Sequence, residues 1–323
     1  MLIFVANEDV LKAANLLCDY YSQGRHIPPG DNWPPYHPKH YTPLTVIYLE
    51  GRCSKSEVLA IAQKFKGTET TVGDTNYSSI YHKTVKSINE LVAPFEGIDS
   101  YPYMMLIEGA PGIGKTILSK EIAFQWANKI ILKDKKLLFL IFMRNPQIRS
   151  ITDVQSFVKY FCQIDSLTIK ISDWLIETGG KNIIIVLDGY DEVSEENKSH
   201  FIVDGIIGRQ RLPKCDIIIT SRPAASSHLH DIVNCRAEVL GFTEEDRESF
   251  IQDALVGQKE ELLMFLKSNP SLNALCKIPL NMSILLCLTE EGINTLPETQ
   301  TILYERFILM TIIHFLKKDI IKF

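Results

Sequence analysis

The sequence predicts an α/β fold in which a parallel sheet flanked by helices is followed by a small helical domain. Runs of apolar residues without polar alternation occur at residues 104–108, 137–143 and 183–187. Such runs are typical of strands buried on both faces of a sheet, and the helical patterns between them are the connections that parallel strands need. After residue 241 the pattern becomes wholly helical, which separates the second part of the chain from the first.

The region before the sheet combines helical patterns with one short strand. Residues 1–24 repeat apolar side chains at helical spacing, and residues 44–49 read as a short strand. A capping-box pattern that begins at Ser54 predicts a helix to about residue 65, and residues 80–92 carry a third helical pattern. Residues 1–100 are therefore interpreted as an N-terminal helical and loop region.

Residues 101–241 alternate strands and helices, and we interpret them as one domain. Beyond the three strands above, residues 217–220 form a further apolar strand and residues 237–240 an edge strand. Helical spacing recurs between the strands in four segments, at residues 116–128, 153–163, 166–178 and 195–208.

Residues 242–295 are predicted to form a small helical domain. It opens with a capping-box-like pattern from Thr243 to Asp246. Proline is tolerated only in the first turn of a helix, so three prolines divide the region that follows into short helices: Pro270, Pro279 and Pro297. The last helix, residues 301–316, is apolar nearly all round and requires burial on the helical domain or on another chain.

Composition excludes several classes of protein. The 323 residues carry a formal net charge of −5, which gives no field to hold a polyanion, so no nucleic acid is expected as a partner. A basic run from Lys129 to Lys136 is interpreted as a solvated connection. The longest apolar runs are far shorter than the roughly 20 residues of a membrane span. Seven cysteines stand singly, which predicts reduced thiols and a cytoplasmic protein.

One glycine-rich segment carries the strongest chemical signal. It fits the pattern Gly-x-x-x-x-Gly-Lys-[Ser/Thr], between a predicted strand and a predicted helix, with the residues Gly109, Ala110, Pro111, Gly112, Ile113, Gly114, Lys115 and Thr116. Glycines let backbone amides turn inward around phosphates, and the helix N-terminus adds partial positive charge. Lys115 is expected to reach the β- and γ-phosphates, and the Thr116 hydroxyl to bind Mg²⁺.

Carboxylates follow the apolar strand at residues 183–187. Asp188, Asp191 and Glu192 come at its C-terminal end, the edge of an open parallel sheet at which ligands bind. Asp188 is placed to hold Mg²⁺ through water, as the second half of the phosphate site. Glu192, or less favourably Asp191, would orient or deprotonate the attacking water.

The next strand along the chain ends in Thr220, Ser221 and Arg222. A hydroxyl and a guanidinium at a strand end beside a triphosphate can sense the γ-phosphate. The alternative, a surface arginine in a loop between a strand and a helix, stays open at this point.

These three motifs, in this order and with this spacing, resemble the NACHT nucleotide-binding module of the NOD-like receptors, within the STAND branch of AAA+-like ATPases. The string from Asp188 to Glu192 is similar to the family's extended acidic motif. The resemblance implies a P-loop NTPase sheet and three parts in order: the nucleotide-binding domain at residues 101–241, helical domain 1 at residues 242–295, and the start of a winged-helix domain at residues 296–323.

The resemblance also implies residues around the base. Pro279 resembles the proline that packs on adenine, and Tyr41 and Thr42 resemble the segment that closes over it. The nucleotide is expected to be ATP or ADP with Mg²⁺. The family's winged-helix histidine has no counterpart before residue 323, so the sequence is interpreted as a fragment or a short member of the family.

By this resemblance the predicted function is an ATP- and ADP-binding switch with weak ATPase activity. It would control assembly of an intracellular, innate-immune-like signalling complex through self-association and protein partners. Two alternatives stay open. One is a non-hydrolytic interaction module in which ADP is a structural ligand. The other, less favoured because no arginine-rich lid follows Arg222, is a P-loop kinase that acts on a small molecule.

Overall fold

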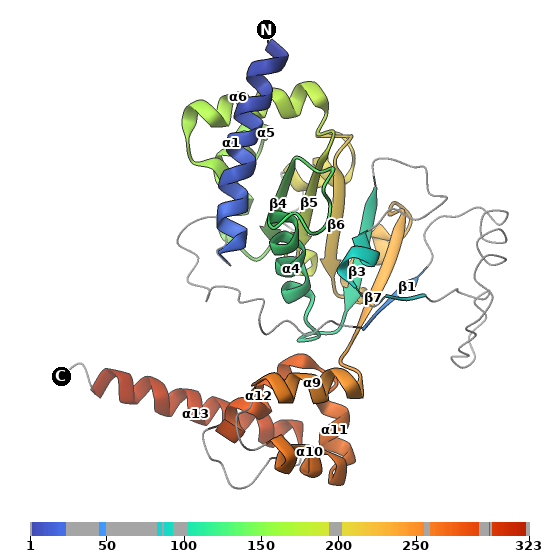
Figure 1. Cartoon of the computed structure of the whole chain (residues 1–323), viewed down its shortest axis with the longest axis vertical. Helices are drawn as coiled ribbons and strands as arrows, with labels where there is room; N and C mark the ends of the chain where they lie inside the picture. The colour runs from blue at the N-terminus through green and yellow to red at the C-terminus, as the bar shows by residue number, and fades with distance from the viewer. Residues whose placement is uncertain are drawn as a thin grey trace, which may run out of the picture. The chain divides into compact units, whose positions relative to one another are not determined.

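The chain divides into two compact units (Figure 1). The first is built around a sheet and takes in residues 46–110 and 115–239 together with the N-terminal helix. The second is mainly helical and consists chiefly of residues 240–323, with residues 42–45 and with residues 111–114 of the phosphate loop. The computed structural model describes residues 2–23, 45–49, 83–85, 87–92, 103–193, 202–254, 259–290, 297 and 299–320.

Seven strands in the described part of the chain form one sheet, in the order β2-β1-β7-β3-β6-β5-β4. Their bounds are β1 Thr45–Leu49, β2 Lys83–Val85, β3 Met104–Gly109, β4 Leu137–Phe142, β5 Ile183–Asp188, β6 Asp216–Ser221 and β7 Cys235–Gly241. The last five strands pair in parallel, whereas β1 and β2 pair antiparallel. The predicted parallel sheet is confirmed, with an antiparallel extension beyond β7.

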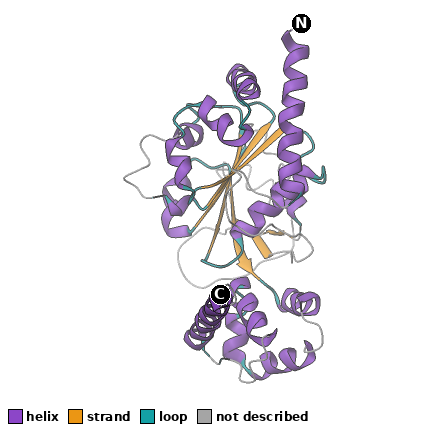
Figure 2. Ribbon diagram, turned by 90° about the vertical axis from the view of Figure 1, so that its left-hand side faces the viewer, coloured by secondary structure: helices purple, strands orange, loops and turns teal. Residues whose placement is uncertain are grey.

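Helices lie on both sides of this sheet (Figure 2). Those of the first unit are α1 Leu2–Ser22, α3 Ile88–Val92, α4 Lys115–Ala127, α5 Val154–Cys162, α6 Asp165–Thr178, α7 Ile202–Ile207 and α8 Pro223–Ser226, with short 3₁₀ turns η2 Pro146–Ser150, η3 Tyr190–Glu192 and η5 Ser227–Leu229. Strands β3, β4, β5 and β6 are buried along their whole length. The core continues into the helices: the Phe139 ring of β4 lies 5.0 Å from Phe157 and 4.8 Å from Phe161, both in α5.

Strand order decides which strand ends meet. β6 lies between β3 and β5, with Ser221 opposite Glu108 and Ile217 opposite Ile185. The chain goes from β3 to β4 at the far edge of the sheet and later returns to β7 on the other side of β3. Ligands of open α/β sheets bind outside the carboxyl ends of strands at such a reversal. The carboxyl ends of β3, β5 and β6 therefore form the natural place for a site.

Two predicted elements differ in the structure. The strand predicted at residues 237–240 is not an edge strand, because β7 lies between β1 and β3. Along β7, buried residues alternate with more exposed ones, a pattern that an edge strand also shows. The helical pattern at residues 80–92 divides into strand β2 and the short helix α3, because pairing with β1 overrides local spacing. The helix predicted at residues 54–65 lies outside the described residues.

One lysine of the basic run is buried. Lys135 Nζ lies 2.7 Å from Asp216 Oδ2 and 2.7 Å from Asp134 Oδ2, and its side chain is only 5% exposed. Burial alone would lower the pKa of Lys135, but hydrogen bonds and attraction to the two aspartates outweigh it and raise the pKa. The interpretation of the run as solvated is therefore wrong for Lys135, although Lys133 and Lys136 are exposed.

The N-terminal helix α1 supplies a hydrogen-bond partner for the backbone of the outer strand β4. β4 ends the strand order, so part of its backbone has no neighbouring strand. The Leu140 N–H donates to Tyr21 Oη at 3.1 Å, and the same hydroxyl lies 3.5 Å from the Leu138 carbonyl oxygen. The Tyr21 side chain is buried, which raises the pKa of its phenol. Helix α1 is therefore bound to the sheet by a polar contact as well as by apolar packing.

The second unit contains five described helices, α9 Glu244–Ala254, α10 Lys259–Ser268, α11 Pro270–Leu275, α12 Pro279–Glu290 and α13 Gln300–Ile320. The predicted capping box is present: the Asp246 N–H donates to Thr243 Oγ1 at 3.1 Å, and the Thr243 N–H donates to Asp246 Oδ2 at 2.8 Å. Pro270 and Pro279 begin α11 and α12, where proline fits.

Over residues 300–313, helix α13 has both buried and exposed side chains. Leu303 is fully buried, and Tyr304 Oη donates to the Oδ1 atom of the buried Asn281 at 2.7 Å. Four apolar side chains farther along the helix are between 42% and 58% exposed, namely Ile308, Leu309, Ile312 and Ile313. Among the helices described, α13 included, none combines the length and apolar character that crossing a membrane requires.

Candidate functional site

The phosphate loop joins β3 to α4. Gly112 and Gly114 have positive φ angles of 72° and 104°, a backbone conformation that favours glycine. Lys115 is the first residue of α4, and its Nζ donates to the carbonyl oxygens of Gly109 at 2.7 Å and Ala110 at 3.1 Å. The Lys115 side chain thus folds back over the first residues of the phosphate loop.

Within the second unit, the tip of the loop contacts the start of α12. The Leu280 N–H donates to the Gly112 carbonyl oxygen at 3.2 Å. A Cβ atom added at Gly112 would lie 3.0 Å from Leu280 Cβ, so a larger residue would be crowded there as well as strained by the positive φ. Pro279, predicted at the adenine, precedes Leu280 and therefore lies close to the loop. Tyr41 and Thr42 lie outside the described residues.

Asp188 lies at the centre of the carboxyl edge. This last residue of β5 is 3% exposed and accepts hydrogen bonds from three hydroxyl groups. Thr116 Oγ1 donates to Oδ2 at 2.8 Å, while Ser119 Oγ and Thr220 Oγ1 donate to Oδ1 at 2.9 and 2.8 Å. The Gly189 N–H donates to Thr220 Oγ1 at 3.0 Å, which leaves the threonine proton for Asp188. The two residues predicted to hold Mg²⁺ are thus in direct contact.

The donor atoms here suit a magnesium ion bound with phosphates. Mg²⁺ prefers oxygen ligands and is usually held by one or two carboxylates, water and substrate phosphates. Thr116 supplies a hydroxyl oxygen at the foot of the phosphate loop, and Asp188 supplies a carboxylate 2.8 Å from it. Among the described residues, no group of three or more His, Cys, Asp or Glu side chains could hold a metal ion by itself.

The acidic turn after β5 holds Asp191 and Glu192 in different surroundings. Gly189 has a φ of 77° and opens the turn η3. Asp191 is mostly buried and engages Arg222 twice: its Oδ2 lies 2.8 Å from Arg222 Nε, and its Oδ1 accepts the Arg222 N–H at 3.2 Å. Glu192 is exposed and forms no such pair, yet partial burial raises the pKa of its carboxyl, with the positive charge of Arg144 acting in the opposite direction.

The electrostatics of Lys115 connect the phosphate loop to the two strand ends. Burial lowers the pKa of Lys115. The negative charges of Asp191 and Asp188 act against this shift, and the positive charge of Arg222 adds to it. The predicted phosphate, magnesium and sensor residues of the first unit therefore share one electrostatic environment.

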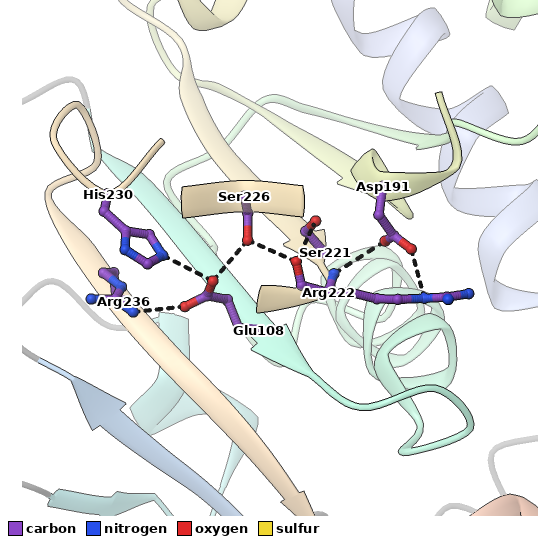
Figure 3. A network of polar contacts seen from close by, with 7 residues as sticks. All are labelled: Glu108, Asp191, Ser221, Arg222, Ser226, His230 and Arg236. Carbon is purple, nitrogen blue, oxygen red and sulfur yellow. Dashed lines mark hydrogen bonds and ion pairs between the residues drawn. The ribbon is translucent and has the colours of Figure 1, made fainter. Parts of the chain in front are cut away.

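The sequence analysis missed Ser119 and Glu108 in this region and did not foresee the partner of Thr220. Ser119 binds Asp188 one helical turn after Thr116, a spacing that would have placed it on the same face of the helix. Thr220 was expected only as one of two hydroxyls at the end of its strand, and its hydroxyl donates to Asp188. Glu108 lies in a strand that is otherwise apolar, and an isolated carboxylate in such a strand could have indicated a buried polar contact. It is 2% exposed and binds Ser226, His230 and Arg236 (Figure 3).

The family model described as NACHT domain matches residues 103–256. Over 198 residues the chain is 27% identical to the "NACHT, LRR and PYD domains-containing protein 10" of Mus musculus, covering 59% of this chain and 28% of that protein. Over 226 residues it is 25% identical to the "NACHT, LRR and PYD domains-containing protein 3" of Bos taurus, covering 63% of this chain and 22% of that protein. The chain spans about a quarter of the length of these relatives.

A solved structure is also similar in part. It is a STAND protein with a tetratricopeptide repeat sensor from Pyrococcus horikoshii, at 16% identity, covering 64% of this chain and 30% of that chain. Its TM-score is 0.38.

Proposed function

Because the NACHT domain family model matches residues 103–256, we propose that the chain is an ATP- and ADP-binding molecular switch with weak ATPase activity. In this proposal the bound nucleotide controls assembly of an intracellular, innate-immune-like signalling complex. One observation carries the proposal: the threonine that ends the phosphate loop is hydrogen-bonded to the buried aspartate at the end of β5. That contact joins the two halves of a Mg²⁺-nucleotide site.

Each residue of the first unit has a part in the proposed chemistry. Lys115 and the loop amides bind the β- and γ-phosphates, and Thr116 with Asp188 holds Mg²⁺. The ion, when bound, neutralises charge that develops on the phosphate oxygens. Glu192 orients the attacking water and accepts its proton, since Asp191 is engaged with Arg222. Arg222, half-exposed at the end of β6, senses the γ-phosphate.

The remaining parts of the proposal concern the base, the partners and the location. Pro279, Tyr41 and Thr42 are proposed to surround adenine. Self-association is supported by the exposed apolar side chains of α13, because contiguous apolar surface of that kind is uncommon on monomers. A cytoplasmic location is supported by free thiols at all six described cysteines. Light scattering across a concentration series tests self-association, and a constant monomer mass would contradict it.

Substitution of Lys115 tests nucleotide binding. Lys115→Ala removes the charge that attracts the phosphates, so ATP affinity measured by calorimetry should fall about a hundredfold or more. Lys181→Ala removes an equal charge from an exposed position and should leave the affinity unchanged. An unaltered affinity in Lys115→Ala would refute the phosphate site.

Substitution of Glu192 tests hydrolysis separately. Glu192→Gln should bind ATP normally and hydrolyse it about 10²–10⁴-fold more slowly, because an amide is a poor base. The base must be ionised, and burial raises the pKa of Glu192. The rate of the parent should therefore fall on acidification at a higher pH than an ordinary glutamate would cause. If the parent shows no turnover, ADP is a structural ligand and the non-hydrolytic alternative replaces this part of the proposal.

A further inference from the structure

A buried polar network connects the strand before the phosphate loop to the arginine at the end of β6 (Figure 3). Its centre is Glu108, the residue that precedes the first glycine of the loop. Glu108 Oε1 accepts from Ser226 Oγ at 2.7 Å and from His230 Nε2 at 2.9 Å, and Oε2 accepts from Arg236 Nη2 at 2.9 Å. Nothing in the proposed nucleotide chemistry uses this carboxylate.

Glu108 is held in its charged form. Burial alone would raise the pKa of this carboxyl, but hydrogen bonds from His230, Ser226 and Arg236 outweigh burial and lower the pKa. Hydrogen bonds to a buried ionised group are short and strong. These hydrogen bonds therefore hold Glu108 and its three partners in fixed positions within the first unit.

The network around Glu108 is connected to Arg222 through the short helix α8. Helix α8 follows Arg222 directly and ends at Ser226. Ser226 Oγ has two acceptors within reach, Glu108 Oε1 at 2.7 Å and the Arg222 carbonyl oxygen at 2.9 Å. Ser221 Oγ lies 3.2 Å from the same carbonyl and can supply its proton there. The single proton of Ser226 is thus free for the charged carboxylate.

The turn from Arg222 to Ser226 is consequently fixed at both ends. Asp191 binds the backbone N–H and the Nε atom of Arg222 at one end, and Glu108 binds Ser226 at the other. In the sheet, Glu108 stands opposite Ser221, which precedes Arg222. Displacement of β3 at Glu108 would be passed to the turn through Ser226.

We propose that Glu108 is a positioning residue for Arg222. Through Ser226 it fixes the turn that carries the arginine against the strand that leads into the phosphate loop. Sensing of the γ-phosphate by Arg222 rests on the proposed function, whereas the positioning itself does not. Loss of Glu108 should therefore weaken the preference for ATP over ADP more than it weakens nucleotide binding as a whole.

The positioning is tested first without nucleotide, on the full chain. The Arg222 Nε–H signal, identified by its loss in Arg222→Lys, is followed by ¹⁵N NMR. Glu108→Gln and Ser226→Ala should each shift this signal and speed its exchange with water. Glu238→Gln, an equal change of charge opposite Glu108 on β7 and outside the network, should leave it unchanged. Ser226→Ala removes only a hydroxyl, so the test holds even if Glu108→Gln fails to fold. An unaltered Arg222 signal in Ser226→Ala would overturn the proposal.

The consequence for sensing is tested by calorimetry with Mg²⁺-ATP and with ADP. The ratio of the two affinities should fall roughly threefold to tenfold in Ser226→Ala and in Glu108→Gln, the effect of one displaced hydrogen bond. Neither change should lower the ratio further in an Arg222→Ala background. Equal loss for both nucleotides would show a merely structural role and overturn the proposal. If the NMR signal responds but Arg222→Ala leaves the ratio unchanged, positioning stands and the sensor role of Arg222 fails.

Discussion

Two buried aspartates stand at opposite ends of neighbouring strands and are satisfied in different ways. Asp216 begins β6 and is 5% exposed, while Asp188 ends β5 and is 3% exposed. Asp216 pairs with the ammonium of Lys135 at 2.7 Å and accepts the Tyr103 N–H at 3.0 Å. Asp188 accepts from three neutral hydroxyls, and no lysine or arginine of the described residues forms an ion pair with it.

We interpret the difference as one between a structural charge and a charge that belongs to the proposed Mg²⁺ site. A buried charge is costly unless a partner compensates it. At the amino end of the sheet the protein provides the compensating cation itself, so Asp216 and Lys135 need nothing further. At the carboxyl end the hydrogen bonds come from neutral hydroxyls, and the charge of Lys115 acts on Asp188 without an ion pair, so we propose that Asp188 attracts a cation from outside. We therefore expect an external cation to bind at the carboxyl edge of the sheet and not at its amino edge.

The largest expected effect comes from breaking the structural pair. Lys135→Met leaves Asp216 buried without its cation and should lower the free energy of unfolding by about 3–5 kcal/mol. Urea unfolding followed by tryptophan fluorescence measures this, since Trp126 Nε1 donates to the Lys135 carbonyl oxygen. Lys133→Met changes an exposed lysine of the same run and should alter stability by less than about 0.5 kcal/mol. Equal effects of the two variants would show that the pair has no structural weight.

A smaller effect, of a different kind, is expected at Asp188. In Asp188→Asn the amide nitrogen faces Thr116, whose hydroxyl can turn to accept, so stability should change by less than about 1 kcal/mol. The contribution of Mg²⁺ to ATP affinity should nevertheless fall about 10–100-fold, as for other carboxylates that hold a metal through water. Calorimetry with and without Mg²⁺ gives this contribution. A large loss of stability with unchanged Mg²⁺ dependence would reverse the comparison.

The smallest effect tests a polar contact that involves no charge. Tyr21→Phe leaves the buried Leu140 N–H without its acceptor and should cost about 1–2 kcal/mol of unfolding free energy. Tyr20→Phe, at the neighbouring half-exposed position, is the control and should cost almost nothing. Hydrogen exchange at Leu140 provides a local readout, because its amide should lose protection only in Tyr21→Phe. Retained protection there would mean that α1 does not satisfy the edge of β4.

Local features of this protein were predictable wherever the signal lies in contiguous residues. The apolar runs of β3, β4 and β5 need no partner to be recognised, since burial on both faces removes polar alternation. The phosphate loop, the acidic turn and the Thr243 capping box are likewise short strings with a fixed chemistry. The roles of Lys115, Glu192 and Arg222 stay predictions, and their proximity in the first unit supports them.

Features that depend on which strand is the neighbour were not predictable. The edge position expected for residues 237–240 was wrong because alternation reports one partly exposed face, not the number of strands alongside. Lys135 read as solvated because its partner Asp216 is far away in sequence.

The sequence by itself determined the α/β class, the buried strands, the phosphate loop and the carboxylates at the end of β5. Their residue types respond to burial and to chemistry that neighbours along the chain already define. Only the tertiary structure decided that β6 lies between β3 and β5. That order brings Thr220 to Asp188 and Ser226 to Glu108, contacts between residues 32 and 118 positions apart. The sequence pattern does not predict such pairings, because the positions of a hydroxyl and a carboxylate along the chain are the same whichever partners they contact in the fold.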